Sequence, residues 1–142
     1  MLHGVMQADL VSRLAQLARD HGPTFLQRAQ PRPGLECQRE LVHAGPELEV
    51  WLLSWLPGQI TPIHDHGGAV TVTTVLAGAL LEERFELVAG GVRTTWREHR
   101  GAGDVDPIDA AAIHRVQPVG AAVTLHLYAP GCVDGRIYQV AA

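Results

Sequence analysis

The stretch that decides the fold is "PIHDHGG", residues 62–68, in which two histidines alternate with an aspartate between a proline and a glycine pair. On a β-strand, residues two apart point to the same face. His64 and His66 are therefore predicted to project together while Asp65 points away. Two imidazoles on one face can reach the same metal ion, so the stretch predicts a metal site. The alternative is a chance pairing among the eight histidines of the chain.

The sequence on both sides of this stretch is typical of a β-protein. After Leu35, short runs rich in Val, Leu, Thr and Trp alternate with glycine or proline turns,. Ala89-Gly90-Gly91 reads as a hairpin turn. Strands are predicted near residues 37–43, 48–55, 60–66, 69–76, 79–87, 92–98, 103–106, 112–117, 121–129 and 136–140. Strands at this spacing indicate a small barrel or a double-sheet jelly roll.

The N-terminal part is predicted to be helical. Between Gln7 and Asp20, four apolar residues recur at helical spacing: Leu10, Leu14, Leu17 and Ala18,. The glycine and proline at 22–23 end this helix. A second helical turn is predicted over 24–28, and 30–34 form a proline-rich connector. We expect one structural domain, with residues 1–34 as helical cap and connector and residues 35–142 as the barrel.

Composition narrows the class of protein. The chain has 142 residues, 46% of them hydrophobic and 18% charged, which is typical of a folded globular domain,. The net charge of −4 without an Arg cluster predicts no nucleic-acid partner, and the apolar runs are too short to span a membrane,. We expect no secretion signal. Cys37 and Cys132 are too few for a disulfide framework, which favours the cytoplasm. The oligomeric state stays open.

The spacing around the histidine pair resembles the first motif of the cupin superfamily, in which a glycine stands six residues before the first histidine of H-x-H and another glycine follows the pair. Gly58 and Gly78 fill the two glycine positions, and His114 in "AIHRVQP" lies where cupins place a third ligand. Many cupins add a glutamate near residue 70, where this chain has valine and threonine. The resemblance therefore implies three neutral imidazoles and an uncompensated +2 charge that favours anionic ligands. Fe(II) with a thiolate fits such a site, and zinc that activates water stays open.

Three stretches together resemble the cysteine dioxygenase family of thiol dioxygenases: "SWLPGQITPIHDH", "AIHRVQP" and "VTLHLYAPG". These proteins are mononuclear iron cupins that add both atoms of O2 to a thiol and form a sulfinate. The resemblance runs from about Cys37 to Gly131. It implies one Fe(II) per chain, held by His64, His66 and His114, and it implies a small thiol and O2 as partners.

The resemblance also implies catalytic roles for Thr124, His126 and Tyr128. These residues alternate along one strand and share a face. The threonine is expected to orient the imidazole, which would hydrogen-bond the phenol and so place it near the reacting atoms. The alternative is a strand whose polar side chains only satisfy one another.

Arg39 in "CQRELV" matches the carboxylate-binding arginine of the family. A guanidinium presents parallel donors that suit a carboxylate; the alternative is a surface arginine paired with Glu36 or Glu40. An arginine here favours cysteine as the substrate. A slip of one residue, to Gln38, would favour 3-mercaptopropionate, and a non-catalytic metal- or ligand-binding cupin is a further alternative.

Two positions depart from the family. Thr71 stands where animal members carry a cysteine that is cross-linked to the tyrosine, and Cys37 stands where the family often has a tyrosine. The other four histidines, His3, His21, His43 and His99, are predicted to lie on the surface.

Overall fold

The computed structural model describes residues 2–131 and 134–142, with side chains described from residue 8. Cys132 and the side chain of His3 lie outside this description. The predicted mainly β class is confirmed: one helix and one 3-10 helix precede eight strands that form one hydrogen-bonded sheet. The elements are α1 (Leu2–His21), η1 (Gly22–Arg28), β1 (Gln38–His43), β2 (Glu49–Trp55), β3 (Ile63–His64), β4 (Val70–Val88), β5 (Gly91–Gly101), β6 (Val105–Ile108), β7 (Ile113–Ala129) and β8 (Ile137–Tyr138).

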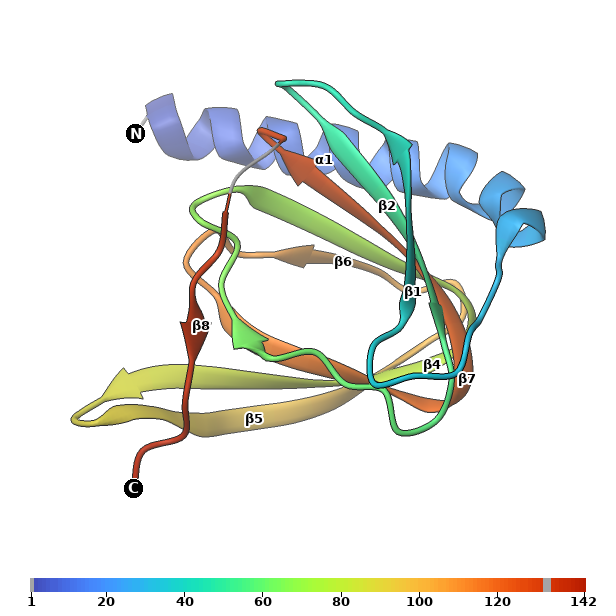
Figure 1. Ribbon diagram of the computed structural model, residues 1–142. Coiled ribbons are helices and arrows are strands. Elements are labelled where there is room, and N and C mark those ends of the chain that lie inside the picture. The colour runs from blue at the N-terminus through green and yellow to red at the C-terminus, as the bar shows by residue number, and fades with distance from the viewer. Residues whose placement is uncertain (1, 132–133) are drawn as a thin grey trace.

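Two long antiparallel strands, β4 and β7, run through both layers of the barrel (Figure 1). Their pairing extends from Val70 opposite Ala129 to Phe85 opposite Ile113. The first half of β4 and the second half of β7 form one layer with β6, β2 and β1. The other halves form the second layer with β5, β3 and β8. The two layers face each other, and the barrel interior lies between them.

The predicted breaks within these strands are wrong. The strands predicted over 69–76 and 79–87 form the single strand β4, which begins at Val70, and those predicted over 112–117 and 121–129 form β7, which begins at Ile113. The pairing of β4 with β7 shifts register between Val75 and Ala79, and Gly78 has a φ of 76°. Such an irregularity bends a strand without ending it, so the glycine moves β4 from one layer to the other. The predicted turn at Ala89 and Gly90, by contrast, joins β4 to β5 as expected.

Helix α1 covers the outer face of the layer that contains β2 and β7 (Figure 1). Leu14 and Ala18 are buried there against apolar residues of β2, β4 and β7. The helix begins five residues before the predicted start, since no proline interrupts its first turns,. It ends at His21, one residue past the prediction, and the predicted second turn is the 3-10 helix η1. No helix in the described part of the chain could cross a membrane.

The side chains of β2 and β7 alternate between the helix and the interior. Val50, Leu52, Leu125 and Leu127 belong to the cluster beneath α1. The residues between them point to the interior. Those at 51, 53, 126 and 128 line the cavity, and Thr124 contacts Trp55, which also lines it. This period of two follows from strand geometry. It places every second residue of β7 at the site.

Strand β3 is much shorter than the predicted strand over 60–66. It contains only Ile63 and His64, because Pro62 lacks an N–H and the glycines at 67 and 68 have positive φ angles,. His66 therefore lies in the turn that leads to β4. Residues 64 and 66 still face the interior together, so the predicted orientation holds although the strand ends early.

We expect Gly78→Ala to lower the free energy of unfolding by more than about 3 kcal/mol. An added Cβ would lie 2.2 Å from the carbonyl oxygen of Ala121 on the paired strand, and the φ of 76° already disfavours alanine. Gly103→Ala is the control, since its φ is 93° but no atom lies within 4 Å of an added Cβ. It should cost roughly 1–2 kcal/mol. Urea denaturation of both variants measures the difference, and equal costs would contradict the crowding argument.

Candidate metal centre

A cavity of about 510 Å³ opens between the two layers of the barrel. One wall carries His64, His66 and His114. The opposite wall, built from β1, β2 and β7, carries polar and aromatic side chains, namely Arg39, Glu49, Trp51, Trp55, His126 and Tyr128. Six of the seven site residues predicted by resemblance thus line one cavity. The seventh, Thr124, lies behind His126 and contacts its ring.

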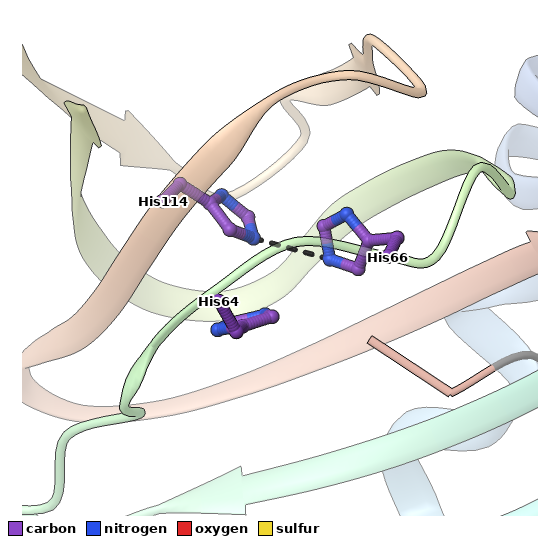
Figure 2. Close-up of side chains that lie close together, drawn as sticks. All are labelled: His64, His66 and His114. Atoms are coloured by element: carbon purple, nitrogen blue, oxygen red, sulfur yellow. Dashed lines mark hydrogen bonds between the residues drawn. The ribbon is translucent and has the colours of Figure 1, made fainter. Parts of the chain in front are cut away.

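The three predicted ligands come together at one point (Figure 2). Their candidate ligand atoms all lie within 4.8 Å of one another, and Nε2 of His66 lies 3.2 Å from Nε2 of His114. Two nitrogens at this separation, each about 2.1 Å from a shared ion, subtend about 100° there. That angle falls between octahedral and tetrahedral geometry. The donor set therefore fits a divalent transition metal such as Fe(II) or Zn(II).

Hydrogen bonds at the far side of two rings prepare them for a metal. Nδ1 of His64 lies 2.8 Å from the carbonyl oxygen of Pro62, and Nδ1 of His114 lies 2.7 Å from the carboxylate of Glu82. Both oxygens only accept, so each Nδ1 carries the proton and each Nε2 keeps its lone pair. Nδ1 of His66 is buried with no hydrogen-bond partner among the described residues.

Burial keeps two of these imidazoles neutral. Desolvation, followed by repulsion from neighbouring imidazoles, lowers the pKa of His64 to about 4 and that of His66 to about 3,. The neutral imidazole is the form that binds a metal. At neutral pH, these two ligands do not have to lose a proton to water before an ion can enter.

The expected absence of compensating negative charge needs a correction. No carboxylate belongs to the histidine cluster, but Glu82 of β4 contacts His114 directly from behind. The stretch "LLEERFE" contains a signal for this contact. Because side chains alternate along a strand, the adjacent glutamates 82 and 83 are expected to point to opposite faces of the sheet. The pattern does not link Glu82 to His114, since Glu82 lies outside the cupin motif and 32 residues from this histidine.

The predicted strand triad is only partly formed. Thr124 Oγ1 lies 2.7 Å from Nε2 of His126 and accepts a hydrogen bond from Nε1 of Trp55 at 2.9 Å. The other ring nitrogen of His126 lies 3.2 Å from the hydroxyl of Thr73. Among the described residues both nitrogens are therefore taken by threonines. The expected hydrogen bond from His126 to the phenol is replaced by a stacked contact with Tyr128, at 6.4 Å between ring centroids.

Both aromatic groups of this triad are uncharged at neutral pH. Burial lowers the pKa of His126 to about 3 and raises the pKa of Tyr128 to about 12,. The ring of Tyr128 lies 5.7 Å from that of His66, measured between centroids, so the phenol stands beside the candidate metal centre as a neutral hydrogen-bond donor,.

Arg39 lies on the cavity side of β1. It lines the cavity, and its guanidinium stacks over the ring of Trp51 at 4.9 Å,. Gln38 points instead into a separate small hollow beside η1. Of the alternative partners predicted for Arg39, Glu40 forms an ion pair with Arg28. The register thus places the arginine, and not the neighbouring glutamine, opposite the histidines.

The family model for cysteine dioxygenase type I matches residues 35–140. The chain belongs to this family. Family membership indicates thiol dioxygenase chemistry, and the three convergent histidines could hold the metal that such chemistry uses.

Solved structures show the same fold. A protein with a double-stranded β-helix domain from Klebsiella pneumoniae has a TM-score of 0.60 at 22% identity, over 80% of this chain and 93% of that chain. A cupin superfamily protein from Desulfitobacterium hafniense has a TM-score of 0.59 at 14% identity, over 74% and 84%. An oxalate oxidase in complex with glycolate has a TM-score of 0.61 at 19% identity, over 79% and 60%. These likenesses confirm the predicted cupin barrel.

One departure from the cysteine dioxygenase pattern is paired with Tyr128, and the other lines the cavity. Thr71 is the residue directly opposite Tyr128 in the pairing of β4 with β7, and it is 1% exposed. A threonine there cannot form a thioether. Cys37 lines the cavity beside Arg39, and burial raises the pKa of its thiol to about 11, so it stays protonated. The smaller side chain leaves room near the arginine.

Asp65 has a role that the sequence did not suggest. Its carboxylate accepts hydrogen bonds from the backbone N–H groups of Gly67 and Arg136, at 3.0 and 2.8 Å, and from the hydroxyl of Tyr138 at 2.6 Å. Strand β8 also pairs with β3. The aspartate between His64 and His66 thus fastens the C-terminal segment to the loop that carries these two candidate ligands, and Gly135 of this segment lines the cavity.

We expect Asp65→Ala to loosen the C-terminal segment. The variant removes the acceptor of three hydrogen bonds, so amide exchange at residues 136–138 should accelerate and stability should fall by about 1–3 kcal/mol. Asp109→Ala is the control, because Asp109 accepts only a local bond from the N–H of Ala111. Hydrogen exchange read by mass spectrometry tests this. Equal protection of residues 136–138 in the two variants would rule out the fastening role.

Proposed function

We propose that this protein is an Fe(II)-dependent thiol dioxygenase whose substrate is a small thiol with a carboxylate, with cysteine as the leading candidate. The reaction is R–SH + O2 → R–SO2H: the sulfur gains two S–O bonds, the O–O bond breaks, and the proton of the thiol passes to a sulfinic acid oxygen. One observation carries the proposal. Three histidines converge in the same cavity as Arg39 and Tyr128, in a chain of the cysteine dioxygenase family.

His64, His66 and His114 would hold one ferrous ion per chain through neutral imidazole nitrogens. Bound there, the ion would supply open coordination positions and the one-electron chemistry that O2 needs in order to react with a thiol. The three histidines bring no negative charge of their own, so the site favours an anionic sulfur ligand.

Arg39 would bind the carboxylate end of the substrate. Its contact with the ring of Trp51 holds the guanidinium against the cavity wall, which lowers the entropy that substrate binding costs,. Because the histidines lie on the opposite wall, a short thiol held at its carboxylate extends its sulfur toward them. This fixes the reacting atom instead of leaving it free in the cavity.

Tyr128 would donate a hydrogen bond to negative charge that develops on oxygen or sulfur. Its phenol keeps its proton, because burial raises its pKa to about 12. His126, fixed by two threonines, stacks on the phenol ring and positions it beside His66. A preorganised neutral donor stabilises developing charge without reorganising during the reaction.

The direct test is thiol-dependent O2 uptake by protein reconstituted with Fe(II). We expect uptake with cysteine, and with 18O2 we expect two labelled oxygens in the sulfinate. Parallel assays with 3-mercaptopropionate, mercaptosuccinate and cysteamine define the substrate. His114→Ala should lose most of the bound iron, whereas His99→Ala, which changes an exposed residue of β5, should keep it. Bound metal without O2 uptake for any thiol would favour the non-catalytic cupin instead.

Arg39→Gln separates substrate binding from metal binding. Loss of charged hydrogen bonds to a carboxylate should lower kcat/KM for cysteine by about 10- to 100-fold. Iron content should not change, and any activity with cysteamine, which has no carboxylate, should be little affected. Arg28→Gln removes a guanidinium that pairs with Glu40, and it serves as the matched control. An equal loss with cysteine and cysteamine would exclude carboxylate recognition by Arg39.

A further inference from the structure

Glu82 stands directly behind the ligand His114, on the side away from the cavity. Its side chain is almost fully buried, and its carboxylate lies 2.7 Å from Nδ1 of His114. Two guanidiniums hold the same carboxylate: Nε of Arg84 lies at 2.9 Å and a terminal nitrogen of Arg100 at 3.3 Å. Each carboxylate oxygen of Glu82 therefore has at least one fixed donor.

This arrangement determines which nitrogen of His114 can bind an ion. An ionised carboxylate has no proton to donate, so the hydrogen bond requires N–H at Nδ1 of His114. Nε2 then presents its lone pair toward His66, 3.2 Å away. The guanidiniums of Arg84 and Arg100, which contact the carboxylate at 2.9 and 3.3 Å, stabilise its ionised form,.

We propose that Glu82 is a positioning residue of the metal centre: it fixes the tautomer and ring orientation of His114 and offsets part of the charge of the bound ion. The inference rests on the metal-binding part of the proposed function. Glu82 acts through His114 and does not line the cavity. A carboxylate hydrogen-bonded to a ligating histidine raises the basicity of the ligand nitrogen and stabilises positive charge on the metal.

The two arginines that bind Glu82 are themselves held by further contacts. Arg100 also pairs with Asp106 at 2.8 Å, and the guanidiniums of Arg84 and Arg100 stack on the ring of Trp96 at 5.1 and 5.7 Å. These contacts immobilise both donors, so the carboxylate has little freedom to leave His114. Rigid support of this kind keeps a ligand ring within the narrow tolerance that a metal site needs.

The neighbouring Glu83 provides a matched control on the other face of the same strand. It is as buried as Glu82 and also binds two guanidiniums, those of Arg97 at 2.8 Å and Arg115 at 2.7 Å. No described contact links it to a histidine of the site. Replacing either glutamate with glutamine removes one buried negative charge and leaves two arginines without their carboxylate. Only Glu82→Gln alters the hydrogen-bond partner of His114.

The first measurement is made on the wild-type protein without metal. NMR of 15N-histidine-labelled protein at neutral pH should show His114 as the neutral tautomer with its proton on Nδ1. Assignment of the resonance comes from its loss in His114→Gln. A proton on Nε2 of His114, or rapid exchange between the two tautomers, would overturn the proposal even if the protein binds iron and is active.

The second measurement compares Glu82→Gln with Glu83→Gln. In Glu82→Gln, affinity for Fe(II) measured by competition with a chelator should fall by about 10- to 100-fold. The Fe(III)/Fe(II) midpoint potential should rise, because loss of the carboxylate destabilises the ferric ion more than the ferrous ion. Glu83→Gln should leave both quantities close to the wild-type values.

The outcomes separate this inference from the proposed function. Equal affinities and potentials in the two variants would overturn the role of Glu82 and leave the dioxygenase proposal standing. A wild-type protein that binds no Fe(II) would overturn both. If Glu82→Gln does not fold, the tautomer of His114 in the wild type still decides the question.

Discussion

The antiparallel pairing of β4 with β7 is the constraint on which the rest of the structure depends. One end of β7 carries His114 in the second layer, and the other end carries His126 and Tyr128 in the first layer. The same pairing brings Glu82 of β4 behind His114 and Thr71 opposite Tyr128. Because side chains alternate strictly along a strand, a slip of one residue in this register would turn every one of these groups to the wrong face.

The charges of the site are separated in space. His66 and His126 are buried, His64 and Tyr128 are half-buried, and all four side chains are neutral at physiological pH. Arg39 provides positive charge in the opposite wall of the cavity. The negative charge of Glu82 lies behind a ligand, where it is compensated by guanidiniums and closed off from the substrate. The carboxylate of Glu82 therefore does not face the cavity, while an ion held by His114 would still receive part of its charge compensation through that ring.

Much of this arrangement could be predicted from the sequence, because strand periodicity and a short motif carry it. The alternation of residues 124, 126 and 128 and the spacing of His64 and His66 are local features, and both put the side chains on the predicted face. The contacts that were missed are between distant residues. Glu82 lies 32 positions from His114, and Asp65 lies more than 70 from its partners Arg136 and Tyr138. Where such a side chain points depends on strand register and on bends such as that at Gly78, which residue types alone do not encode.

The same pairing explains how Tyr128 is held without a covalent link. In animal members of the family, a thioether restrains the tyrosine; here the residue opposite it is Thr71, whose hydroxyl cannot form that bond. The ring of Tyr128 instead contacts two imidazoles: it is stacked on that of His126 at 6.4 Å and tilted against that of His66 at 5.7 Å, measured between centroids. His126 is in turn fixed by hydroxyls at both nitrogens. Because contacts with two neighbouring rings, one of them fixed, limit the orientations of the phenol, packing can supply the restraint that the cross-link supplies elsewhere.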